Sequence, residues 1–134
     1  MSWTRFLFAI LAAGIVSCFT DWFFSGILFH AKYNAYPEVW RESVGQRDTR
    51  AITGSVALGF VTSAAFVATC VVFRLHGYDQ TLSLAGLAWL IVPVPLLVTN
   101  ALFIKLHPLT VVSHSLGWLA KLAVAALSTA FFLA

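Results

Sequence analysis

Four long apolar stretches constrain the fold of this chain more than any other feature. They cover about residues 3–29, 51–73, 81–103 and 111–133. An α-helix rises about 1.5 Å per residue, so about 20 apolar residues cross the roughly 30 Å hydrocarbon core of a bilayer. Only 10% of the residues are charged, against roughly 25% in soluble proteins. The sequence therefore predicts one all-α integral membrane domain over residues 1–134, an antiparallel bundle of four transmembrane helices.

Two local features modify this expected bundle. Pro37 suits the first turn of a helix, and apolar residues recur every four positions from Tyr36 to Val44. This pattern predicts a short interfacial helix in the loop between helices 1 and 2.

Pro93 and Pro95 lie in the middle of the third stretch. Each removes a backbone donor and clashes with the preceding turn, so we expect helix 3 to be kinked near residues 90–93.

Small residues recur every four positions in the second stretch, at Ser55, Gly59 and Ser63. This spacing lets membrane helices approach each other closely. We expect it to serve packing within the monomer, and a dimer interface is the alternative.

The basic residues are distributed unequally between the two ends of the bundle. The loops that follow the first and third stretches contain Lys32, Arg41, Arg47, Arg50 and Lys105, whereas the other end has Arg5 and Arg74. Cytoplasmic loops carry the excess of Lys and Arg. We therefore expect both of these loops in the cytoplasm and both termini outside. The basic residues are few and flank membrane spans, so we expect no nucleic-acid partner.

The two cysteines, Cys18 and Cys70, both fall within apolar stretches, and we expect buried thiols rather than a disulfide. An alternative exists for the N-terminus. Arg5, the apolar residues 6–14 and Cys18 together resemble a lipoprotein signal that ends at a lipidated cysteine. However, residues 19–24 continue as a hydrophobic segment, which favours an unprocessed first helix.

Asp21 and Lys121 are charged residues inside membrane-spanning stretches. Charges at this depth are costly and normally face a partner, a cavity or a functional site. Asp21 lies about eight residues, or about 12 Å, from the expected cytoplasmic face, and Lys121 about ten residues, or about 15 Å, from the same face. We expect them to form an ion pair that joins helices 1 and 4. There are two alternatives. The two residues could form the floor of a small polar pocket, or they do not pair, in which case Lys121 snorkels and Asp21 is neutral or pairs with a partner protein.

Further polar residues belong to the same half of the membrane. Asn100 and His114 lie closer to the cytoplasmic face, and Ser25 follows Asp21 by four residues, on the same face of helix 1. With Asp21 and Lys121 they form the candidate binding cluster. The outer half is expected to be mainly apolar, apart from the hydroxyl groups of helix 2. The sequence therefore predicts a polar vestibule that opens to the cytoplasm.

No catalytic or metal-binding motif is present. The chain has no Cys-x-x-Cys, His-x-x-x-His, glycine-rich phosphate loop or Gly-x-Ser-x-Gly, and its histidines are scattered. We therefore expect no catalytic residue, no metal site and no cofactor.

The chain resembles a family of small bacterial four-helix inner-membrane proteins known only as a domain of unknown function. The resemblance rests on Trp22-Phe23-Phe24-Ser25-Gly26 with Phe29, on the Trp40 loop, and on residues 99–103 with His114 and Trp118. It implies the fold and the membrane location and no activity. The family usually has a proline after the tryptophan motif of helix 1, which this chain lacks.

These features predict a protein without catalysis of its own. It would act as a binding or transport-type protein, or as an accessory subunit of a larger membrane complex. Its expected partners are the lipid bilayer and a larger complex or further copies of itself. The alternative is a membrane-embedded enzyme that acts on a lipid or a small apolar substrate.

Overall fold

The computed structural model describes residues 2–33, 35–39 and 49–133. Its elements are α1 (Trp3–Asp21), the π-helix η1 (Trp22–Leu28), α2 (His30–Tyr33), the 3-10 helix η2 (Pro37–Val39), α3 (Thr49–Val72), α4 (Tyr78–Ile91), α5 (Pro93–Phe103) and α6 (Pro108–Leu133). Four helical segments within these residues are long and apolar enough to cross a membrane: Trp3–Leu28, Thr49–Val72, Tyr78–Phe103 and Pro108–Leu133. The predicted all-α membrane fold with four spanning helices is confirmed.

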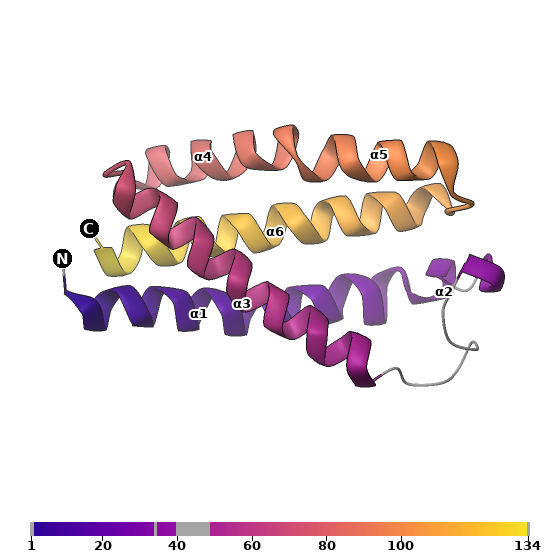
Figure 1. The fold of residues 1–134 in the computed structure, drawn as a ribbon, viewed down its shortest axis with the longest axis horizontal. Coiled ribbons are helices and arrows are strands. Elements are labelled where there is room, and N and C mark those ends of the chain that lie inside the picture. Colours follow the sequence, from indigo (N-terminus) through magenta and orange to yellow (C-terminus); the bar gives the residue numbers. More distant parts are fainter. Residues whose placement is uncertain (1, 34, 40–48, 134) are drawn as a thin grey trace.

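Helix α6 is the centre of the bundle. It packs against α1 and η1, against α3, and against both α4 and α5. Figure 1 shows α1, α6 and the α4–α5 pair side by side, with α3 crossing α6 and α1 obliquely. The buried residues of α6 are mostly small: Thr110, Ser113, Gly117, Lys121, Leu122, Ala125, Ala126, Thr129 and Ala130. Small side chains let several neighbours approach one helix closely.

The oblique path of α3 leaves its two halves in different environments. Residues 49–58 are all exposed, whereas Gly59, Ser63, Phe66, Val67 and Cys70 are buried. The apolar core is formed around this second half and contains Ala13, Phe66, Cys70, Ala85, Leu122, Ala125 and Ala126. The first half of α3 therefore stands away from the packed core, at the end of the bundle where α1 is continued by η1 (Figure 1).

The glycine that packing requires is Gly14 of α1, and not Gly59 in the small-residue pattern of α3. A Cβ added at Gly14 would collide with the ring of Phe60. At Gly59 an added Cβ meets no atom within 4 Å, although Gly59 and Ser63 are buried. Gly59 and Ser63 thus lie on the packed side of α3, whereas Ser55 is exposed. The position that does not accept a Cβ is Gly14 on α1.

The proline break in the third span is confirmed. Helix α4 ends at Ile91 and α5 begins at Pro93, with Val92 between them at φ −116° and ψ −67°. Pro93 has no N–H to continue the hydrogen-bond ladder of α4. Just before the break, the indole Nε1–H of Trp89 donates to the backbone oxygen of Ser115 at 2.8 Å, which ties this span to α6.

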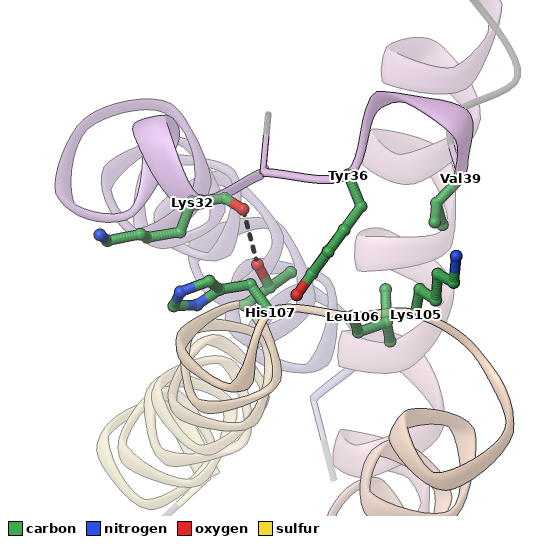
Figure 2. A pocket seen from close by; sticks show the side chains of 7 residues that line it. Lys32, Tyr36, Val39, Lys105, Leu106 and His107 are labelled. Atoms are coloured by element: carbon green, nitrogen blue, oxygen red, sulfur yellow. Dashed lines mark hydrogen bonds between the residues drawn. The ribbon is translucent and has the colours of Figure 1, made fainter.

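The connection after the first span packs onto the turn between α5 and α6 (Figure 2). The Thr110 hydroxyl donates to the backbone oxygen of Lys32 at 3.3 Å, and Figure 2 shows the Tyr36 side chain pointing toward this turn. The space between these residues is only about 10 Å³, about enough for one water molecule. Helix η2 supplies the first turn of the expected interfacial helix, whose later part, with Trp40 and Val44, lies outside the described residues.

The start of α6 is fixed by its own sequence. Pro108 occupies the first helical position, where a missing N–H has no cost. His107 precedes it, and its Nδ1 accepts a hydrogen bond of 3.1 Å from the backbone N–H of Leu109. His107 therefore acts as a helix cap, which sets where α6 enters the membrane.

We predict that Gly14→Ala lowers stability by about 1–3 kcal/mol, because the new methyl group must displace the Phe60 ring. Gly59→Ala is the matched control, because it also adds one methyl group at a buried glycine. It should change stability by less than about 1 kcal/mol, since it meets open space and gains helix propensity. Thermal unfolding of the purified protein in detergent measures both, and equal losses would contradict the packing described.

Candidate functional site

The first span changes its helical geometry directly after Asp21. Residues Trp22–Leu28 form a π-helix, which closes with a hydrogen bond of 3.0 Å from the N–H of Phe29 to the oxygen of Phe24. The widened turn is tied to α6, because the Ser113 hydroxyl donates to the oxygen of Phe24 at 3.4 Å. π-Helices are rare and often occur at functional sites. No sequence pattern identified this one, since hydrophobic periodicity does not separate it from an α-helix.

Asp21 and Lys121 form an ion pair at membrane depth. Lys121 Nζ lies 2.8 Å from Asp21 Oδ2, and the predicted pairing is confirmed. The two side chains differ in access, because Lys121 is 10% exposed and Asp21 is 34% exposed. Lys121 Nζ also lies 5.0 Å from the centre of the Trp118 ring, within the range of a cation–π interaction.

Gly117 lies close to this pair on α6. It lies one turn before Lys121, and a Cβ at this position would be 3.9 Å from Asp21 Oδ1, an ordinary van der Waals contact. The carboxylate thus has Oδ2 on Lys121 and Oδ1 on the side of Gly117.

The ion pair lines a cavity of about 190 Å³ between the first span, α3 and α6. The lining residues are Asp21, Phe24 and Ser25 from α1 and η1, Ser55, Leu58 and Thr62 from α3, and Ser113, His114, Gly117, Trp118 and Lys121 from α6. The structure therefore brings four of the five candidate residues to one cavity, namely Asp21, Ser25, His114 and Lys121.

Asn100, the fifth candidate, does not line this cavity. It belongs to α5, which packs on the side of α6 away from α1 (Figure 1). Counting residues along a helix gives the depth of a side chain in the membrane but not the side of the bundle that it faces. The expectation that Asn100 joins the cluster is therefore wrong for a geometric reason.

Sequence reasoning missed the contribution of α3. The hydroxyl groups of the second span were expected in the outer half, yet Ser55 and Thr62 line the same cavity as Asp21. A count from the start of α3 at Thr49 was the available signal, because Ser55 lies only six residues into the helix. Counting residues along α3 does not predict that this helix crosses its neighbours obliquely.

The cavity combines one ion pair with hydroxyl groups, an imidazole and aromatic rings, which suits binding of a small polar or amphipathic molecule. Within the described part of the chain, no group of three His, Cys, Asp or Glu side chains could hold a metal ion. Comparison with protein-family models, with curated proteins and with solved structures gives no match to this chain.

We predict unequal losses of stability when each partner of the ion pair is neutralised. Asp21→Asn leaves the more buried Lys121 ammonium without a counter-charge, so it should cost about 1–3 kcal/mol. Lys121→Gln leaves a carboxylate with access to the cavity and should cost less. The charge-swapped double variant Asp21→Lys with Lys121→Asp should recover part of the loss.

The exposed pair of Glu38 and Lys105 is the control, with a separation of 4.0 Å and side chains that are 57% and 77% exposed. Glu38→Gln should leave the unfolding temperature unchanged, because exposed pairs contribute little. Simple additivity of Asp21→Asn and Lys121→Gln in a double variant would argue against direct contact.

Proposed function

We propose that this protein is a non-catalytic integral membrane protein that binds a small polar or amphipathic ligand in the cavity between α1, η1, α3 and α6. One observation carries the proposal: the ion pair borders an accessible cavity instead of being sealed in the bundle. Asp21 is 34% exposed and the cavity measures about 190 Å³. The cavity leaves the carboxylate within reach of a ligand, whereas a pair sealed in the bundle would not be.

The exposed first half of α3 supports lateral access to this cavity. Ser55 and Leu58 line it, and residues 49–58 around them are exposed. A ligand could thus enter from the membrane or from the adjacent aqueous face. Lys32, Arg50 and Lys105 lie at this end of the bundle, which favours a cytoplasmic opening with both termini outside. The resemblance to bacterial inner-membrane proteins supports that membrane as the location.

Binding fits the architecture better than conduction by a single chain. Beyond Lys121, the core residues Ala13, Phe66, Leu122 and Ala125 pack together toward the end of the bundle where α1 begins. The cavity therefore ends at a packed apolar layer. Transport by this protein would need a rearrangement of that layer or an assembly of several copies.

Binding also fits the hydroxyl groups better than catalysis. The hydroxyls of Ser25 and Thr62 donate to the backbone oxygens of residues 21 and 58. A nucleophilic hydroxyl needs instead to donate to a general base. An enzyme that acts on a lipid is thus not favoured by these two groups.

An accessory subunit of a membrane complex is the second candidate. It is favoured by the same exposed segment, residues 49–58 of α3, where a helix of a partner protein could pack. This candidate predicts a stoichiometric protein partner in mild detergent.

We predict that the purified protein retains a bound small molecule or lipid in native mass spectrometry, and that Ser55→Leu strongly reduces this occupancy by filling the cavity. Thr53→Leu is the matched control on the same helix, because Thr53 is exposed and does not line the cavity. It should leave occupancy unchanged. Equal occupancy in both variants would contradict the proposed site, and a protein partner without a bound ligand would favour the accessory subunit.

A further inference from the structure

The chemistry of the cavity specifies the charge of its ligand. The accessible ionic group is the carboxylate of Asp21, which is 34% exposed. Its Oδ2 lies 2.8 Å from Lys121 Nζ, and its Oδ1 would be 3.9 Å from a Cβ built at Gly117. A carboxylate oxygen accepts hydrogen bonds and attracts positive charge.

The ammonium of Lys121 is already committed. It is only 10% exposed, lies 2.8 Å from Asp21 Oδ2 and faces the Trp118 ring at 5.0 Å. An anion that approached Lys121 would have to displace Asp21 or bring a second negative charge next to it. The geometry therefore disfavours an anionic group as the part of the ligand that binds here.

The hydroxyl groups around the carboxylate present acceptors. Ser25 donates to the oxygen of Asp21 at 2.7 Å and Thr62 to the oxygen of Leu58 at 2.9 Å. A hydroxyl has one hydrogen, so these two groups offer only their lone pairs to a ligand. Together with the carboxylate, they form a set of acceptors that suits a ligand with several N–H donors.

We propose that the cavity binds a primary ammonium group, an inference that rests on the ligand-binding function proposed above. Such a group has three N–H donors and a positive charge, which match Asp21 Oδ1 and the lone pairs of Thr62 and Ser25. The apolar part of the ligand contacts Leu58 and Trp118. A volume of about 190 Å³ is far more than a bare metal cation fills and leaves room for a short organic chain.

Two sources share this chemistry. The ammonium could belong to the ethanolamine headgroup of a phospholipid that enters laterally beside the first half of α3. It could also belong to a free amine that enters from the aqueous face. The two sources are distinguished by offering each probe separately to the same protein.

The test measures binding of defined probes to the full-length protein in detergent. Native mass spectrometry compares phosphatidylethanolamine with phosphatidylcholine and phosphatidylglycerol, and thermal shift compares ethanolamine with choline and with sodium chloride at equal ionic strength. We expect phosphatidylethanolamine, ethanolamine or both to bind at least about tenfold more tightly than the matching choline compound. The reason is that a quaternary ammonium lacks the N–H donors for charge-assisted hydrogen bonds.

Two variants connect the binding to the cavity. Asp21→Asn should weaken binding of the ammonium probe about tenfold or more, because it removes the accessible charge. Since this variant also disturbs the ion pair, Thr62→Val provides a milder test. It removes one acceptor and keeps the shape, and it should weaken binding about fivefold. Thr53→Val is its matched control, because Thr53 makes the same type of hydrogen bond, to the oxygen of Thr49 at 2.8 Å, outside the cavity.

Binding of phosphatidylethanolamine alone would support the lipid source, and binding of ethanolamine alone the free amine. Equal binding of choline compounds, or preferred binding of phosphatidylglycerol, would overturn the ammonium inference. If no amine probe binds but the protein retains another molecule that Ser55→Leu abolishes, the ammonium inference is overturned. The ligand-binding function stands in that case. Failure of every probe, together with unchanged occupancy in Ser55→Leu, would overturn the ligand-binding function as well.

Discussion

The ion pair between Asp21 and Lys121 is the interaction on which the rest of this structure depends. A charged side chain at the centre of a membrane helix costs about 2.5–3.5 kcal/mol on insertion scales. The pair reduces this cost in two ways, because each charge has an opposite partner at 2.8 Å and because Asp21 borders a cavity. These two effects together require that α1 lies beside α6 and that α3 does not seal the space between them.

The arrangement of the helices follows from these requirements. Lys121 lies near the middle of α6, and Gly117 lies one turn before it, beside the carboxylate. Around them the bundle is divided into a polar half with the cavity and an apolar half with the core. The oblique path of α3 serves both halves, since its second half packs in the core while Ser55 and Thr62 line the cavity.

The depth of a side chain in the membrane could be predicted from the sequence, whereas the side of the bundle that it faces could not. Counting from the membrane faces brought Asp21 and Lys121 to one level, and the structure pairs them. The same count put Asn100 near them, but α5 lies across α6 from the cavity. Likewise, proline chemistry predicted the break at Pro93, because it acts locally. The π-helix after Asp21 and the crossing of α3 depend on contacts between distant segments, which no local pattern encodes.

In this structure Lys121 is a shielded ammonium that Asp21 holds inside the membrane. Nitrogen-15 NMR of lysine-labelled protein in lipid nanodiscs tests this pairing, with Lys121→Arg to assign the signal. We predict an ammonium signal with slow hydrogen exchange for Lys121 that shifts and exchanges faster in Asp21→Asn, while Lys105, which is 77% exposed, exchanges rapidly in both proteins. A Lys121 signal that matches Lys105, or one that Asp21→Asn leaves unchanged, would contradict the account.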